Sequence, residues 1–160
     1  MVVKKILLSI LLISSLLNAD IFEKGGVHLG VSLGIGSTSY SGTYTVAGVS
    51  ANYFVLDGLS VGAGYRGWFG IDPMRNELSL ASTYYIPVSE MFRPYVGAFV
   101  RETFVSGYDN YASVGARGGL SIVSGKTYFS VGYAYEQFSN CIFAGECYTS
   151  YPELVFGVSF

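Results

Sequence analysis

The chain has 160 residues, of which 51% are hydrophobic, 16% aromatic and 12% charged, and the charged share is about half that of an average soluble domain. This composition excludes an intrinsically disordered chain, which needs few apolar and many charged residues. The net charge of −2 argues against a nucleic-acid-binding protein, because no basic excess is present to neutralise phosphates.

The first nineteen residues predict a secretory signal peptide. Lys4 and Lys5 form a positive segment, residues 6–17 form an uncharged apolar core, and Ala19 is a small residue at the expected cleavage site. The apolar core is too short to cross a bilayer as a helix. We therefore expect an exported protein that is cleaved between Ala19 and Asp20, with residues 20–160 forming one domain.

From Asp20 onward, apolar residues alternate with small or polar ones at a period of two, which is typical of β-strands. In the first such stretch, Leu29, Val31 and Leu33 alternate with Gly30 and Ser32. No run of 18 apolar residues is present to form a transmembrane helix. The pattern predicts eight strands, at residues 26–38, 43–55, 59–70, 76–88, 94–105, 111–123, 127–138 and 149–160.

The connections between these strands fall into two sets. Three of them, at residues 56–58, 89–93 and 124–126, lie on one side, and four lie on the other, at residues 39–42, 71–75, 107–110 and 139–148. This arrangement is that of an even-stranded antiparallel meander, and eight strands suffice to close one barrel.

The face opposite the apolar residues decides where the barrel lies. It is made of Gly and Ser with a few charges, which is too small and too uncharged for a solvated exterior but fits a narrow lumen. We therefore predict an all-β, eight-stranded, up-and-down transmembrane barrel with its apolar face toward lipid. Aromatic residues near the strand ends predict two interfacial belts: Tyr40, Tyr44, Phe69, Phe104, Tyr108, Tyr111 and Phe138 at one end, and Tyr53, Tyr84, Phe92, Tyr95, Tyr128 and Phe129 at the other.

The last strand ends in a terminal aromatic residue, with apolar residues at every second position before it: Leu154, Phe156, Val158 and Phe160. This pattern resembles the C-terminal assembly signal of bacterial outer-membrane barrels, and the chain from Asp20 onward resembles the small eight-stranded proteins of the OmpA/OmpX type. The resemblance implies a Gram-negative outer membrane, with the short turns in the periplasm and the longer loops at the cell surface. It also implies the barrel assembly machinery, membrane lipid and lipopolysaccharide as partners, and we expect a monomer.

Charged residues on the inward face predict a lumen closed by ion pairs. The set is Arg66, Arg117, Glu136 and Glu153, with Glu77 at the rim, and with Arg101 if Val96, Ala98 and Val100 point outward. That last condition leaves Glu102 on the lipid side. Unpaired charges in so narrow a space cost several kcal/mol each, so we expect pairing, especially of Arg117 with Glu136 on the neighbouring strand. We expect little steady conductance, and we expect Arg117→Ala to lower stability or to produce channel openings.

Cys141 and Cys147 are the only cysteines, and both lie in the longest predicted loop. An even pair in an exported protein predicts a disulfide.

Two motifs that resemble enzyme signatures occur inside predicted strands. Residues 30–34 match the hydrolase Gly-x-Ser-x-Gly pattern near His28, and residues 62–67 match a dinucleotide-binding pattern, but neither precedes a predicted helix. We therefore expect no catalysis, cofactor or metal. The function expected is a structural or surface-interaction role. The alternatives are a narrow channel for ions or small solutes, and a lipid-modifying enzyme that uses His28 and a serine.

Overall fold

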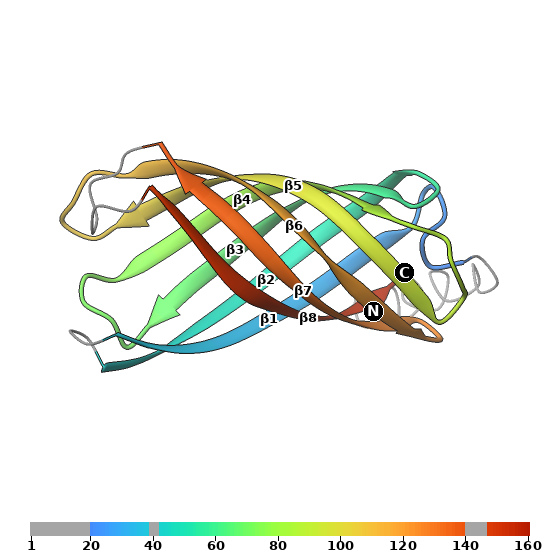
Figure 1. The fold of residues 1–160 in the computed structure, drawn as a ribbon, viewed down its shortest axis with the longest axis horizontal. Coiled ribbons are helices and arrows are strands. Elements are labelled where there is room, and N and C mark those ends of the chain that lie inside the picture. Colours follow the sequence, from blue (N-terminus) through green and yellow to red (C-terminus); the bar gives the residue numbers. More distant parts are fainter. Residues whose placement is uncertain (1–19, 39–41, 140–146) are drawn as a thin grey trace, which may run out of the picture.

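The computed structural model describes residues 20–38, 42–139 and 147–160. Within these ranges, eight strands follow one another around a closed antiparallel barrel (Figure 1), which confirms the predicted fold class. No helix among these residues is long and apolar enough to cross a membrane. The strands are β1 (Val27–Thr38), β2 (Gly42–Leu56), β3 (Leu59–Phe69), β4 (Arg75–Tyr85), β5 (Phe92–Val105), β6 (Tyr111–Ser124), β7 (Thr127–Phe138) and β8 (Tyr148–Ser159).

The strand bounds agree closely with the predicted ones except between β4 and β5. β4 ends at Tyr85 rather than at residue 88, because Pro87 has no N–H to donate to a neighbouring strand. Two tight connections each contain a glycine at positive φ, Gly58 (φ 75°) between β2 and β3 and Gly125 (φ 58°) between β6 and β7. Glycine adopts this conformation without steric cost, so both turns remain short.

The pairing of β1 with β8 closes the barrel over a shorter length than any other strand pair. It runs from His28 opposite Ser159 to Ser32 opposite Val155. Beyond that point, residues 33–38 of β1 and 148–154 of β8 remain strands but do not pair with each other. In Figure 1 the two strands diverge toward the end of the barrel that carries the longer connections. We call these unpaired stretches of β1 and β8 the β1–β8 seam.

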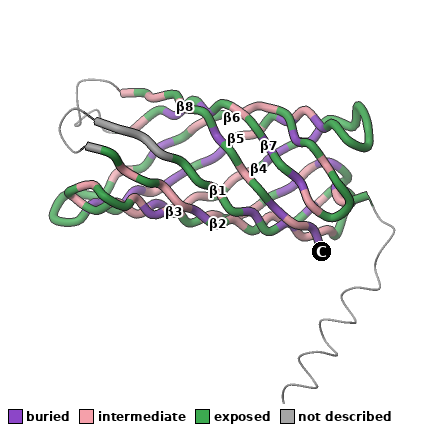
Figure 2. Tube along the Cα trace, turned by 90° about the horizontal axis from the view of Figure 1, so that it is seen from below, coloured by how far each residue is buried: buried purple, intermediate pink, exposed green. Residues whose placement is uncertain are grey.

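Exposed and buried residues alternate along the strands, as the colours of Figure 2 show. The outward side chains are mostly large and apolar: Leu33 is 64% exposed and Leu80 is 61% exposed. The inward side chains include His28, Arg101 and Glu136, all of which are buried. An apolar exterior around a polar interior is the arrangement of a transmembrane barrel and the reverse of a soluble one.

The two aromatic belts are only partly formed as expected. The following rings are exposed near the strand ends: Phe69, Phe104 and Tyr108 at one end, and Tyr53, Tyr84, Phe92 and Phe129 at the other. In contrast, Tyr95 and Tyr128 are buried, and Tyr44, Tyr111 and Phe138 line a cavity. The period of two places these five rings on the inward face. Tyr40 lies outside the described residues.

Candidate functional site

The lumen has room for long side chains because β1 and β2 contribute only small ones at its middle. Ser32 lies so close to Gly48 that a Cβ on that glycine would come within 2.7 Å of the serine Oγ. A Cβ on Gly30 would come within 2.8 Å of the Ser50 Oγ. Arginine and glutamate side chains from the other six strands extend into this space.

Among the six charged side chains at the middle of the lumen, Arg101 of β5 and Glu136 of β7 form the shortest ion pair. Arg101 Nη1 lies 2.6 Å from Glu136 Oε2, and both side chains are buried. The Tyr151 hydroxyl donates to the same carboxylate oxygen at 3.0 Å and accepts from Arg101 Nη1 at 2.9 Å. The Ser113 hydroxyl donates to Glu136 Oε1. Hydrogen bonds to both carboxylate oxygens offset part of the cost of burying the charge.

Glu77 lies inside this network, although the sequence pattern placed it at the rim. It is 5% exposed, and its Oε1 accepts a hydrogen bond from Trp68 Nε1 at 2.8 Å. Its Oε2 lies 3.4 Å from Arg101 Nε and 3.7 Å from Arg66 Nε. The register of β3 and β4 places Glu77 directly opposite Arg66, which explains why the carboxylate is directed into the lumen.

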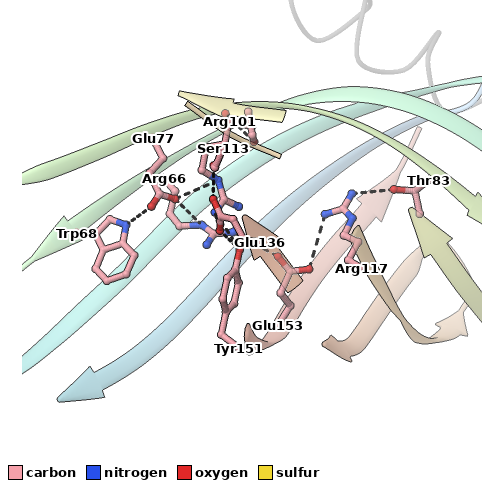
Figure 3. A network of polar contacts seen from close by, with 12 residues as sticks. Arg66, Trp68, Glu77, Thr83, Arg101, Ser113, Arg117, Glu136, Tyr151 and Glu153 are labelled. Atoms are coloured by element: carbon pink, nitrogen blue, oxygen red, sulfur yellow. Dashed lines mark hydrogen bonds and ion pairs between the residues drawn. The ribbon is translucent and has the colours of Figure 1, made fainter. Parts of the chain in front are cut away.

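Arg66 and Arg117 extend the network across the barrel (Figure 3). Arg66 Nη2 on β3 lies 3.5 Å from Glu153 Oε1 on β8, and the two strands are separated in the barrel by β1 and β2. Arg117 Nη1 lies 3.9 Å from Glu153 Oε2, and its Nη2 donates to Thr83 Oγ1 at 2.8 Å. The lumen is therefore spanned from side to side by charged groups.

The structure brings all six predicted charged residues into one network but pairs them differently. The expected partner of Arg117 was Glu136, whereas Arg117 contacts Glu153 and Glu136 contacts Arg101. The register of β6 and β7 places Glu136 opposite Gly115 and Arg117 opposite Ala134, so the two are offset along the strands. Four further polar partners were not predicted, although their inward positions in the alternation are a signal that could have identified them: Trp68, Thr83, Ser113 and Tyr151.

Residues 20–26, directly before β1, fold into the short-turn end of the lumen, a feature that the sequence pattern did not predict. We call them the N-terminal plug. The Phe22 carbonyl accepts a hydrogen bond from Gly58 N at 2.8 Å, and Lys24 N donates to Asp57 Oδ1 at 2.8 Å. The plug is therefore bound through its backbone to the turn between β2 and β3.

Phe22 fills the base of the barrel with other aromatic rings. It is 1% exposed, and its ring centroid lies 4.6 Å from that of Tyr85 and 5.7 Å from that of Phe54. Arg93 covers Phe22 at 5.1 Å and forms an ion pair with Asp20. Further buried rings complete the cluster: His28, Tyr95 and Tyr128.

Two cavities occupy the rest of the lumen. The smaller, of about 60 Å³, is lined by the plug-end rings of Tyr85 and Tyr95 on one side and by Arg117 and Glu153 on the other. The larger, of about 1020 Å³, reaches from the ion-pair network toward the longer connections. Arg117 and Glu153 line both cavities. Arg117 and Glu153 therefore lie where the small inner cavity adjoins the large outer one.

His28 and the enzyme-like motifs have structural settings that account for them. His28 Nε2–H donates to the Ile21 carbonyl at 2.6 Å, and its ring stacks on Tyr128 with 4.7 Å between centroids. The motif at residues 30–34 lies within β1, and that at 62–67 within β3, so neither forms the strand-to-helix turn that its chemistry requires. Among the described residues, no three His, Cys, Asp or Glu side chains gather to hold a metal ion.

Several sequence predictions fall at or beyond the limits of the described residues. Ala19 and Cys141 lie outside them, so cleavage between Ala19 and Asp20 and the disulfide of Cys141 with Cys147 stay predictions. The C-terminal segment is described: Phe160 exchanges backbone hydrogen bonds with Val27, and its ring is 54% exposed. Of the other assembly-signal residues, Leu154 and Phe156 are exposed and Val158 is half-buried.

Comparisons with known proteins identify the fold. No family model and no curated protein matches the sequence. The N-terminal β-barrel domain of Pseudomonas aeruginosa OprF is similar, with a TM-score of 0.65, 16% identity, and 86% of this chain and 98% of that chain covered. Neisserial surface protein A has a TM-score of 0.58 and 19% identity, with 84% of this chain and 94% of that chain covered. The outer membrane protein OprG from Pseudomonas aeruginosa has a TM-score of 0.52 and 14% identity, with 86% of this chain and 97% of that chain covered. These neighbours are eight-stranded outer-membrane barrels, so they support a membrane barrel.

Proposed function

We propose that this chain is a small bacterial outer-membrane protein with a structural or surface-interaction role and a lumen that does not conduct. The proposal includes export by cleavage after Ala19, assembly by the barrel assembly machinery, and a monomer surrounded by lipid and lipopolysaccharide. The apolar exterior and the outer-membrane barrels among its structural neighbours support this location.

The observation that carries the non-conducting role is the presence of two barriers in series. The first is the ion-pair network, in which Arg66 reaches across the lumen to Glu153. The second is the N-terminal plug, in which Phe22 is 1% exposed among other rings. The cavity between them is small, at about 60 Å³. An ion crossing the barrel would have to displace both barriers.

Conductance measurements on purified protein in planar bilayers test this proposal. We expect no steady wild-type conductance. The plug alters the expectation for Arg117→Ala: that variant loses stability but stays closed, because Phe22 still blocks the base. The double variant Phe22→Ala/Arg66→Ala removes both the ring at the base and the contact across the lumen, so we expect measurable openings. Lys126→Ala, on an exposed turn, serves as a control.

A large and stable wild-type conductance would contradict the proposal and favour the narrow channel instead. The same conclusion would follow if the wild type and the double variant conducted equally. The contacts of His28 with Ile21 and Tyr128 give no support to a lipid-modifying enzyme.

A further inference from the structure

The β1–β8 seam includes a residue of β8 that has no backbone donor. Phe160 exchanges hydrogen bonds with Val27, and in an antiparallel pair every second residue is bonded to the same neighbour. The residues of β8 whose backbone groups face β1 therefore include Leu154 and Pro152. Proline has no N–H, so continued pairing past Leu154 would lack a hydrogen bond at Pro152. The edge of β8 is poorly suited to close the seam.

The large outer cavity extends to this seam. Its walls include Ser32, Leu33 and Gly34 of β1 and Pro152, Glu153 and Leu154 of β8. Leu33 and Leu154 line the cavity and are also exposed on the outer face of the barrel. The seam therefore joins the outer cavity to the apolar outer face.

The floor of the outer cavity presents positive charge. The side chains of Arg66 and Arg117 are 20% and 22% exposed, whereas those of Glu77, Glu136 and Glu153 are 6%, 3% and 9% exposed. The network contains as many arginines as glutamates, and Arg101 is as buried as the carboxylates, but Arg66 and Arg117 are more accessible than any of the three glutamates. Arg117 Nε is buried and has no hydrogen-bond partner among the described residues.

The walls above this floor are largely aromatic. Tyr44 stacks on Trp68 with 5.1 Å between ring centroids, and Tyr111 meets Phe138 edge-to-face at 5.6 Å. Val46 lines the same cavity. A cationic floor, apolar walls and a seam at the apolar outer face together match a molecule that has an anionic head and an apolar tail.

We propose that the outer cavity binds an anionic amphiphile with a single acyl chain. Its carboxylate or phosphate head contacts Arg66 and Arg117, and its chain passes along the aromatic walls and through the β1–β8 seam into the membrane. The cavity volume of about 1020 Å³ lies at the upper end of the range of about 300–1,000 Å³ for small-molecule sites. This binding needs no passage through the barrel, so it goes beyond the proposed non-conducting role and does not depend on it.

Trp68 is the only tryptophan in the chain and lines the cavity, which gives a direct measurement. The protein is reconstituted in phosphatidylcholine vesicles and titrated with dibromostearate, whose bromine atoms quench nearby tryptophan. We expect saturable quenching by dibromostearate and at least about tenfold weaker apparent affinity for dibromostearyl alcohol, which has no charge. A parallel measurement with brominated phosphatidylglycerol in the bilayer distinguishes binding of a two-chain membrane lipid from binding of a single-chain amphiphile.

Arg66→Gln and Arg117→Gln test the head site. Each is expected to weaken the apparent affinity for dibromostearate about tenfold while the alcohol titration stays unchanged. Folding of each variant is verified by heat-dependent migration on a gel. Arg117 is also expected to contribute to stability, so Arg117→Gln can fail to fold. In that case Arg66→Gln alone tests the head site.

A cross-link across the seam tests the lateral path. In a Cys141→Ser/Cys147→Ser background, the pair Leu33→Cys/Leu154→Cys is bridged by a short bifunctional thiol reagent and compared with the pair Leu29→Cys/Val158→Cys. The control pair lies on the same two strands, where they are already paired. We expect the first bridge to reduce quenching at least tenfold and the control bridge to leave it unchanged.

Two results would overturn the proposal. The first is equal quenching by the acid and the alcohol, unaffected by Arg66→Gln, since Trp68 would then sense chains in the bilayer rather than a bound anion. The second is equal quenching by brominated phosphatidylglycerol, which would assign the cavity to a two-chain membrane lipid.

Discussion

At the scale of single residues, Arg101 carries the largest share of the lumen contacts. Its guanidinium lies within ion-pair distance of both Glu77 and Glu136 and donates to the Tyr151 hydroxyl. Removing one partner of a buried ion pair leaves the other charge without compensation, which costs more than the pair itself contributes. Glu77 also contacts Arg66, whereas Arg101 is the arginine that contacts Glu136.

We expect Arg101→Ala to lower the free energy of unfolding by about 3–5 kcal/mol, because it leaves Glu77 and Glu136 buried without their shared cation. Lys126→Ala, at an exposed turn, is the control and is expected to change stability by less than about 0.5 kcal/mol. The measurement is urea unfolding of the reconstituted protein. Equal stability of the two variants would show that the network is too hydrated to matter.

The inward positions of charged residues were predictable from the alternation, but their partners were not. A period of two assigns Arg66 and Glu153 to the inward face without indicating that they meet across the lumen. Their contact depends on the small residues of β1 and β2 and on the stagger of the strands around the barrel. Sequence spacing gives no information on either.

At the scale of secondary-structure elements, β8 contributes to two different processes. It closes the barrel with β1, and by resemblance it carries the assembly signal that ends at Phe160. The backbone of Phe160 is bonded to Val27, while its ring is 54% exposed. Barrel closure therefore uses the backbone of Phe160, whereas the proposed recognition would use its ring.

We expect Phe160→Ser to reduce the amount of protein assembled in the outer membrane of cells more than it reduces stability after refolding in vitro. The backbone hydrogen bonds with Val27 remain in this variant, and the loss of an exposed ring costs at most about 3 kcal/mol. The measurement compares outer-membrane yield with urea unfolding, and Phe160→Tyr serves as the matched control. Wild-type yield of the serine variant at normal expression would refute a signalling role.

The strands could be predicted because each contains enough alternating residues to show a period of two. The N-terminal plug contains no such alternation. Residues 20–26 contain one short apolar pair, Ile21 and Phe22, flanked by charged residues, which reads as an ordinary linker. The plug forms because Phe22 fits among rings contributed by distant strands, Phe54 and Tyr85. Such a match between separate elements leaves no periodic signal.

At the scale of the whole molecule, apolar side chains face outward and charged ones face inward. Leu80, at the middle of β4, is 61% exposed, and Met74, in the connection before β4, is 58% exposed. In water these two residues would be equivalent surface positions. In a bilayer they differ, because Leu80 lies at the depth of the hydrocarbon and Met74 near the interface.

We expect Leu80→Arg to destabilise the protein in vesicles by about 2–4 kcal/mol and Met74→Arg by about 1 kcal/mol or less. The free energy of unfolding in lipid vesicles measures both. A soluble barrel would tolerate the two substitutions equally. Equal effects would therefore contradict the membrane location, whatever the fold.

The N-terminal plug also determines which compartment the lumen can respond to. Under the proposed non-conducting role, Phe22 seals one end of the lumen, and a solute in the outer cavity exchanges with one side of the membrane only. A concentration gradient across the membrane would then not change how much of the cavity is occupied. Occupancy of the cavity would follow the solute concentration on that single side.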